Sequence, residues 1–393
     1  MRPLRPSGPR LLPGAILRGR YRVDRLLTEG AAGMVLAATD LGISKSPVAI
    51  KLVHAARRTP LLEARFARET RLAAGLGSEH LARVGAFGHT DTGDPFIVME
   101  MLSGRDLAAE LAERGRLPIA EAVDAVVEAC AGVAEAHAAG LLHRDLKPRN
   151  LFVTREAGAA PSIKVLDFGL AGVSDEKGSI DLTDTESDFG SPQYLAPEQI
   201  RASWQVDART DQHALAAVLY ELLTGTPPFT APDVTRLAVA IAVDPPPHAR
   251  EARPEVPPAL DGAICRALAK RPDDRFPALL GFAEAVAPFG GERALAALEA
   301  VRALPAIAAS SRTTRAPPAR SPLLTLVSAV ATLSAFGAYG VAMRCAPQPA
   351  SAADHADLTV PNPPSPARVR EEAGDPALLQ LSREGAGDGG HGR

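Results

Sequence analysis

Between residues 21 and 100, hydrophobic residues come in short runs that are typical of β-strands. The runs are YRVDRLL, MVLAATD, PVAIKLV and PFIVME. One longer stretch, LLEARFARETRLAAGL, has helical spacing and is bounded by Pro60 and Gly75. The pattern predicts a mostly antiparallel sheet interrupted by a single helix.

From Leu117 onward the pattern becomes helical. The stretch IAEAVDAVVEACAGVAEAHAAG carries apolar residues at three- and four-residue spacings, and Gly140 stands where a helix ends. Two short strands, LFVT and IKVLDF, and a polar loop over 171–189 come next. Further helices are predicted at DQHALAAVLYELLTG, DVTRLAVAIAV, ALDGAICRALAK and ALLGFAEAVAPF. The pattern therefore predicts a β-rich half followed by a helical half.

Composition fits a globular protein with an ample core, because 46% of the 393 residues are hydrophobic and 23% are charged. The net charge of −3 gives no argument for nucleic acid, and no nucleic-acid partner is predicted. The chain has three cysteines without paired spacing, which argues against a disulfide framework or a cysteine-rich metal site.

Beyond about residue 290 the composition shifts to Ala, Arg, Pro and Ser. We interpret 291–320 as a juxtamembrane linker. The run 321–343 has no charge between Arg320 and Arg344, and it is long enough to span a bilayer. Arginines are more frequent before the run than after it, which predicts that the N-terminal side faces the cytoplasm. The alternative is a buried helix of a soluble domain, which the proline-rich flanks disfavour.

Five strongly polar residues lie within LLHRDLKPRN, at 141–150, beside an apolar strand. They are His143, Arg144, Asp145, Lys147 and Asn150. Unpaired charges are costly to bury, so the cluster is either a solvated turn or a place where several charges meet a ligand.

Four other stretches bear on that choice. Gly30 and Gly33, in LTEGAAGMV, would let a hairpin approach a polyphosphate, although glycine-bearing hairpins are common. Lys51 ends the strand VAIK, and Glu69 in the predicted helix could hold it, the alternative being a solvated helix face. Asp167 follows an apolar strand in VLDFGLA, either as a turn cap or as an oxygen ligand for Mg²⁺.

In this order and spacing, HRDLKPRN, DFG and APE resemble the eukaryotic-like serine/threonine protein kinases of the bacterial membrane-anchored type. The resemblance covers residues 15–290 and implies the α+β bilobal protein-kinase fold, with ATP between the lobes. We expect this domain to be followed by a single transmembrane helix at 321–343. Residues 1–14 and the extracytoplasmic tail, 344–393, are expected to be disordered.

The resemblance also implies roles for individual residues. Asp145 corresponds to the catalytic base, and Lys147 to the lysine that steadies the transferring phosphoryl group. Asn150 and Asp167 would hold Mg²⁺, with Mn²⁺ as an alternative. Lys51, paired with Glu69, would orient the α- and β-phosphates.

The residues implied to contact ATP come from the glycine loop and the residues after it, from the VAIK strand, from the hinge and from the LFVT strand. They are Leu27, Thr28, Glu29, Gly30, Ala31, Ala32, Gly33, Met34, Val35, Ala49, Lys51, Met99, Glu100, Leu102 and Phe152. Thr28 stands where the family has its first loop glycine, and Ala31 and Ala32 also depart from the common pattern. A threonine there stiffens the hairpin without touching the charged groups.

Other positions are implied to be structural. Glu198 would pair with Arg275, Asp211 would brace the catalytic loop, and His143 would pack beside Phe168. Ser191 stands where the family has a substrate-positioning threonine.

Arg144 has the place of an arginine that pairs with a phosphorylated activation loop. The acceptors in that loop are Ser174, Ser179, Thr183, Thr185 and Ser187.

The sequence thus predicts a single-pass inner-membrane serine/threonine kinase with a cytoplasmic kinase domain. It would act on protein substrates, and autophosphorylation would involve a homodimer. A pseudokinase that binds without turnover is one alternative, which Thr28 alone favours. A small-molecule phosphotransferase is the other, and the APE segment and Lys147 argue against it.

Overall fold

The computed structural model describes residues 13–30, 33–42, 45–53, 60–156, 158, 160–168, 192–201 and 206–304. The chain divides into two units, and every described residue belongs to the first, Met1–Ser334. Among these residues no helix has the length and apolar character needed to cross a membrane. The predicted transmembrane run at 321–343 and the tail lie outside the described residues.

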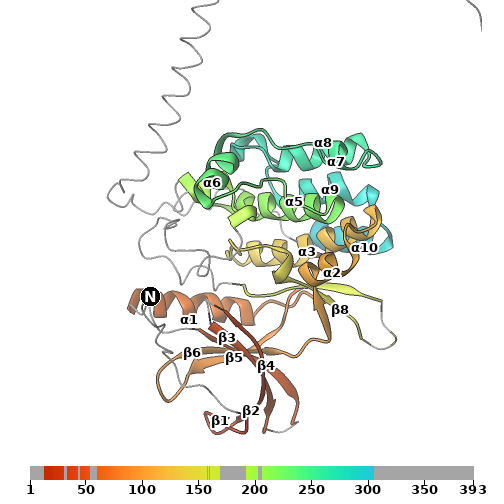
Figure 1. Ribbon diagram of the computed structural model, residues 1–393. Helices are drawn as coiled ribbons and strands as arrows, with labels where there is room; N and C mark the ends of the chain where they lie inside the picture. Colours follow the sequence, from red (N-terminus) through yellow and green to blue (C-terminus); the bar gives the residue numbers. More distant parts are fainter. Residues whose placement is uncertain are drawn as a thin grey trace, which may run out of the picture. The chain divides into compact units, whose positions relative to one another are not determined.

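A six-stranded antiparallel sheet forms the N-terminal part (Figure 1). In spatial order its strands are β1 (Ile16–Leu17), β2 (Tyr21–Gly30), β3 (Gly33–Asp40), β4 (Pro47–Val53), β6 (Pro95–Glu100) and β5 (Val84–His89). Helix α1 (Pro60–Ala74) packs against β5. The four predicted strands and the single predicted helix are confirmed.

Register within the sheet places the predicted nucleotide residues next to one another. Val35 is the cross-strand partner of Lys51, and Ala49 is the partner of Met99. The sheet buries Leu36, Ile50 and Val98 on its core face. Because side chains alternate along a strand, this burial fixes which residues point the other way.

The C-terminal part is built around α3 (Ile119–Ala138), which is buried along most of its length. A three-stranded sheet of β7 (Gly104–Asp106), β8 (Leu151–Thr154) and β9 (Ser162–Val165) lies against it. The other helices are α2 (Leu107–Arg114), α4 (Pro197–Arg201), α5 (Ala208–Thr224), α6 (Val234–Val243), α7 (Ala249–Ala252), α8 (Pro258–Ala267), α9 (Leu279–Val286) and α10 (Glu292–Ala303). The helices predicted in this half are confirmed.

Helix α10 corrects the prediction that a linker begins at residue 291. The helix packs against α3 and buries Leu298 and Val301. The carboxylate of Asp124 on α3 accepts the N–H groups of Gly291 at 2.7 Å and Ala294 at 3.0 Å, and so caps the start of α10. The Ala- and Arg-rich composition resembles a linker, but the cap comes from a residue far away in the sequence.

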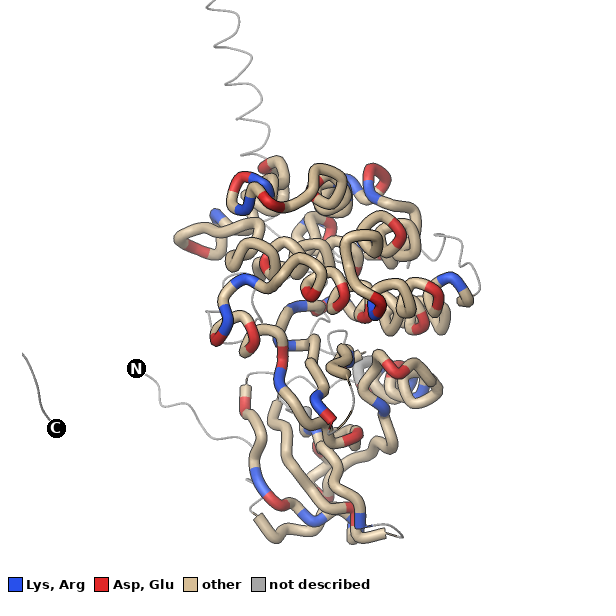
Figure 2. Tube along the Cα trace, turned by 90° about the vertical axis from the view of Figure 1, so that its right-hand side faces the viewer, with Lys and Arg blue, Asp and Glu red and all other residues tan. Residues whose placement is uncertain are grey.

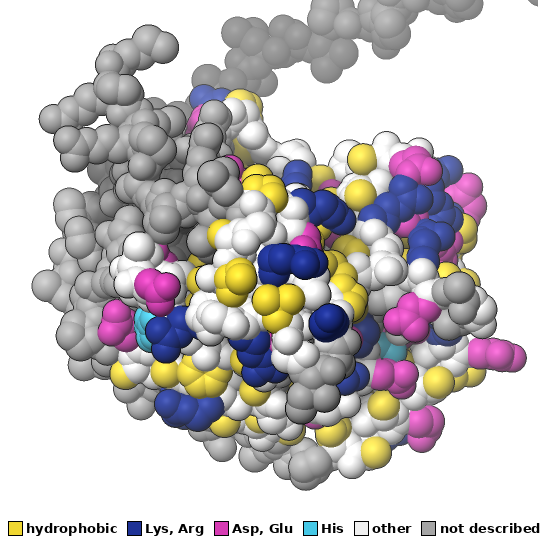
Figure 3. Space-filling view, turned by 90° about the horizontal axis from the view of Figure 1, so that it is seen from below, with side chains coloured by type: hydrophobic (Ala, Val, Ile, Leu, Met, Phe, Trp, Pro, Cys, Tyr) yellow, Lys and Arg dark blue, Asp and Glu magenta, His cyan; other side chains and the backbone are white. Residues whose placement is uncertain are grey.

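Charged residues of both signs are interspersed along the trace (Figure 2). The end of the molecule that carries the six-stranded sheet, seen in Figure 3, has hydrophobic side chains mixed with Lys and Arg. Asp and Glu are also present on this face, so Figure 3 gives no argument for a nucleic-acid partner.

Candidate functional site

Helix α5 holds the segment that contains the polar cluster through hydrogen bonds to its backbone. Asp211 is fully buried, and its carboxylate accepts the backbone N–H groups of His143 at 2.8 Å and Arg144 at 2.7 Å. His137 Nε2 lies 2.7 Å from the same carboxylate. Burial acts to raise the pKa of Asp211, but these hydrogen bonds and nearby histidines hold it below its usual value. The predicted bracing role of Asp211 is confirmed.

Three polar residues of this loop, Asp145, Lys147 and Asn150, contact one another. Lys147 Nζ lies 3.0 and 2.8 Å from the two carboxylate oxygens of Asp145. Asn150 Nδ2 donates to the backbone oxygen of Asp145 at 2.6 Å. Arg144 adopts a left-handed conformation, with φ of 67°, which turns the chain between the anchored backbone and Asp145. Asp145 and Lys147 therefore form an ion pair beside Asn150, and the Asp145 side chain remains 44% exposed.

A second stretch brings Asp167 to the same place. The N–H of Leu166 donates to the backbone oxygen of Asn150 at 2.9 Å, and His143 Nε2 lies 2.8 Å from the backbone oxygen of Leu166. The His143 ring packs beside Phe168 as predicted; the two ring centroids are 4.7 Å apart in an edge-to-face arrangement. Asp167, with φ of 64°, points its carboxylate at Lys51 Nζ, 2.8 Å away.

Glu69 does not pair with Lys51, which corrects the prediction. Its Oε1 accepts from Arg65 Nε at 3.0 Å and lies 3.8 Å from Arg144 Nη1. Arg65 lies four residues before Glu69 on α1, and side chains at this spacing are neighbours on any α-helix. This pair therefore does not depend on how α1 packs. Among the described residues, neither Glu69 Oε2 nor Arg144 Nε has a hydrogen-bond partner, and both atoms are buried. Lys51 has its ion pair with Asp167 instead.

Within the six-stranded sheet, the predicted nucleotide contacts lie on β2, β3 and β4 and at the end of β6. Leu27, Thr28, Glu29 and Gly30 are exposed on β2, and Ala31 and Ala32 lie outside the described residues. Gly33 opens β3 with φ of 141°, a conformation that favours glycine. Further along β3, Met34 and Val35 are partly buried.

The hinge residues are held by backbone and charge contacts. Met99 and Glu100 end β6, and Leu102 follows them. The N–H of Glu100 donates to the backbone oxygen of Arg83 at 3.0 Å, and its carboxylate pairs with Lys164 at 2.8 Å. Phe152 is on β8 in the C-terminal part, and its cross-strand partner on β9 is Lys164.

Glu198 and Arg275 form the predicted buried pair. Two parallel contacts of 2.8 and 2.7 Å join the carboxylate to the guanidinium. The neighbouring Gln199 donates its Nε2–H to the backbone oxygen of Arg144 at 2.9 Å, which ties α4 to the catalytic loop. Ser191 and all five activation-loop acceptors lie outside the described residues.

Two positioning residues were not predicted from the sequence. His137 lies in the last turn of α3, the helix predicted from its apolar spacing, and it contacts Asp211. Gln199 follows the APE segment directly and carried no signal of its own. Their contacts depend on residues at least 50 positions away, because the two hydrogen bonds span 74 and 55 residues.

The oxygen donors of the site suit a hard divalent cation. Asp167 contributes a carboxylate, and the amide nitrogen of Asn150 is engaged as a donor, which leaves the amide oxygen for a ligand. Mg²⁺ prefers one or two such protein oxygens together with substrate phosphates. The residues present therefore fit the metal that the sequence implies.

The chain shares its domain with known proteins. Residues 21–281 match the model of the protein kinase domain. The serine/threonine-protein kinase pkn3 of Myxococcus xanthus is 36% identical over 266 residues, which cover 67% of this chain and 48% of the relative. PknB of Mycolicibacterium smegmatis is 36% identical over 266 residues, covering 66% of this chain and 41% of the relative.

The chain thus spans less than half the length of these two relatives. Among solved structures, the PknI kinase domain of Mycobacterium tuberculosis is similar, with 31% identity and a TM-score of 0.57. That match covers 71% of this chain and 99% of the solved chain.

Proposed function

Because the chain belongs to the protein kinase family, we propose that it transfers the γ-phosphate of ATP to serine and threonine hydroxyls of proteins. One observation carries the proposal. The stretches HRDLKPRN and LDF meet so that the charges of Asp145, Lys147, Asp167 and Lys51 lie in two adjoining pairs. A solvated turn would not need the second stretch.

In this proposal Asp145 accepts the hydroxyl proton while the substrate oxygen bonds to the γ-phosphorus and the bond to the β–γ bridging oxygen breaks. Lys147, beside that carboxylate, stabilises negative charge on the transferring group. Lys51 holds the α- and β-phosphates, and Asp167 and Asn150 would hold Mg²⁺, which neutralises charge on the β- and γ-phosphates when bound. The adenine ring would lie between Val35 and Ala49 on one side and Phe152 on the other.

Turnover separates this proposal from its alternatives. The full-length protein is incubated with γ-labelled ATP and Mg²⁺, alone and with a generic basic protein. We expect label on protein serine and threonine, and its loss in Asp145→Asn. A pseudokinase would bind ATP and transfer nothing, and a small-molecule phosphotransferase would leave the proteins unlabelled. Equal labelling by Asp145→Asn would refute the role of Asp145.

Regulation by phosphorylation of the activation loop is the second part of the proposal. Burial and the nearby charge of Arg65 lower the pKa of Arg144, so its guanidinium lies in a poorly compensated setting. The carboxylate of Glu69, which it shares with Arg65, is 3.8 Å away. An incoming phosphate is a better partner for such a group. The alternative is a constitutively active kinase in which loop carboxylates satisfy Arg144.

Mass spectrometry after incubation with ATP tests this part, beside the double variant Thr183→Ala/Thr185→Ala. We expect phosphate on the loop of the wild type and lower activity in the double variant. A wild type without loop phosphate and a fully active double variant would contradict the regulation. Mixing catalytically dead and active chains would show whether transfer occurs between two copies.

Membrane anchoring is the third part. The uncharged run 321–343 and the arginines that precede it support an inner-membrane protein whose kinase domain is cytoplasmic. Reporters fused after residue 393 should be exported, and deleting 321–393 should release the protein from the membrane. A reporter that stays in the cytoplasm would overturn the orientation.

A further inference from the structure

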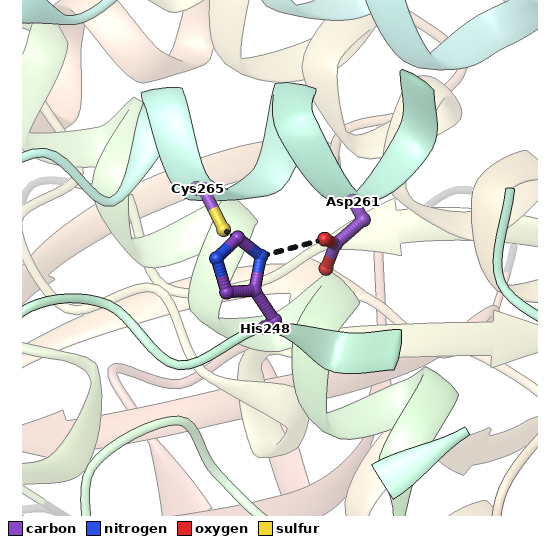
Figure 4. Close-up of side chains that lie close together, drawn as sticks. All are labelled: His248, Asp261 and Cys265. Atoms are coloured by element: carbon purple, nitrogen blue, oxygen red, sulfur yellow. Dashed lines mark hydrogen bonds and ion pairs between the residues drawn. The ribbon is translucent and has the colours of Figure 1, made fainter. Parts of the chain in front are cut away.

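A histidine, a carboxylate and a thiol converge on one face of α8, and none of the three belongs to the proposed ATP site. Asp261 and Cys265 are four residues apart on the helix and therefore share a face. His248, at the start of α7, points between them (Figure 4). Its Nδ1 lies 2.7 Å from Asp261 Oδ2 and 3.5 Å from Cys265 Sγ. One ligand atom from each residue lies within 4.8 Å of the other two.

Ordinary hydrogen bonding explains only part of this arrangement. Asp261 is buried, and His248 Nδ1 together with the N–H of Arg250, 3.4 Å away, gives it hydrogen-bond partners. That accounts for the carboxylate. The thiol donates to the backbone oxygen of Pro247 at 3.9 Å, and its sulfur also lies beside the ring nitrogen that contacts Asp261, so three potential ligand atoms meet at one place.

A nucleophilic role for the thiol does not fit either. Burial, with the charges of Asp261 and Glu251, raises the pKa of the Cys265 thiol to about 11. An activated cysteine needs the opposite shift. The carboxylate of Asp261, which lies within 4.8 Å of the sulfur, instead makes the neighbourhood favourable for a cation.

We propose that His248, Asp261 and Cys265 bind one zinc-class divalent cation through Nδ1, a carboxylate oxygen and the thiolate, with water as fourth ligand. Sulfur and imidazole ligands select such an ion over Mg²⁺, which prefers oxygen. Tetrahedral Zn²⁺ with bonds of about 2.0–2.3 Å places its ligand atoms about 3.3–3.8 Å apart. The 3.5 Å between Nδ1 and Sγ falls in this range, whereas the 2.7 Å between Nδ1 and Oδ2 would have to lengthen. The His248 side chain is 59% exposed and has room to move.

The cation would add a direct link between two segments that already share the hydrophobic core through Ala249 and Leu260. His248 ends the proline-rich connection 244–248 that follows α6, and the other two ligands lie on α8. A bound ion would therefore fasten this connection to the helix. Because the ion binds only the folded arrangement, it would also raise the unfolding temperature.

Cobalt titration of the full-length protein tests the proposal. The protein is stripped with EDTA, desalted and titrated with Co²⁺ in the absence of ATP. We expect one Co²⁺ per chain, with a thiolate-to-cobalt charge-transfer band and the visible bands of tetrahedral cobalt. Zn²⁺ should displace it and excess Mg²⁺ should not. No step requires phosphoryl transfer, so the outcome is independent of the proposed kinase activity.

Variants identify the ligands. Cys265→Ser should abolish the charge-transfer band. His248→Ala should weaken Co²⁺ binding at least about tenfold, because even outer-shell changes cost that much. Circular dichroism checks that the loss of this hydrogen-bond partner of Asp261 leaves the fold intact. Cys345→Ser and His89→Ala are the matched controls and should leave the titration unchanged. A wild type without the band, or a band that survives in Cys265→Ser, would overturn the proposal, as would unchanged Co²⁺ affinity in His248→Ala.

Discussion

The pair of Glu198 and Arg275 offers a sharp test of how the segment after the activation loop is held. The Arg275 side chain is fully buried, and Glu198 is 8% exposed. Besides its two contacts with the carboxylate, Arg275 donates to the backbone oxygens of Ala269 and Arg209, at 2.9 and 2.8 Å. Thr210 Oγ1 donates to Glu198 at 2.9 Å. Each charge therefore depends on the other in a place that water does not reach.

Glu198→Gln keeps the shape of the side chain and removes its charge. One amide oxygen remains as an acceptor, but the new NH₂ group replaces the second acceptor that faces Arg275. Breaking a buried pair on one side costs about 3–5 kcal/mol, because the remaining charge is uncompensated. Domains have a free energy of unfolding of about 5–15 kcal/mol, so the loss would be about a fifth of that or more.

Urea unfolding followed by circular dichroism measures the effect. We expect a large fall in the transition midpoint for Glu198→Gln, and a smaller one for Glu198→Gln/Arg275→Met, which removes both charges. Glu299→Gln is the matched control. It breaks an exposed pair with Arg302 and should change the free energy of unfolding by less than about 0.5 kcal/mol. A loss below about 1 kcal/mol in Glu198→Gln would refute the reasoning.

Three further predictions follow from single contacts. Lys51→Met should cut phosphoryl transfer by orders of magnitude and leave the circular dichroism spectrum unchanged, and near-normal turnover would contradict the assignment. Burial, with two nearby cations, lowers the pKa of His213 well below its usual value, so the unfolded chain alone binds a proton there in mild acid. From about pH 7.5 to about pH 5.5 the native state should lose about 1.4 kcal/mol through this histidine. Stability curves should show that loss in the wild type and not in His213→Phe, and parallel curves would contradict it. Gly132→Ala would place a Cβ 2.7 Å from the backbone oxygen of His80 and should cost about 1–3 kcal/mol in urea unfolding. Its control, Gly262→Ala in α8, has open space within 4 Å and should stabilise by about 0.4–1 kcal/mol, and equal effects would show that the close approach is relieved without cost.

The order of strands and helices was predictable because hydrophobic spacing records local geometry. The four strands found by alternation bury one face, and α3 and α5 bury apolar residues at helical intervals. β5 was missed because VGAFGH contains two glycines and has partly exposed residues throughout. α10 was missed because its stability comes from α3, including the bidentate pair of Arg293 with Glu128 at 2.9 and 2.8 Å.

Within the site, the motifs predicted the contact of the buried Asp211 carboxylate with the backbone of the catalytic loop. The partner of Glu69 could not be predicted in this way, because Lys51, Arg65 and Arg144 are all candidate partners for one carboxylate. Ion pairs with partial exposure differ by only about 0–1 kcal/mol, so residue type cannot rank them. The position of α1 decides, and in this structure Arg65 and Arg144 are nearest. An anion that captures Arg144 would remove one of the two cations near Glu69, and a phosphorylated loop of the kind proposed above would thereby affect α1 directly.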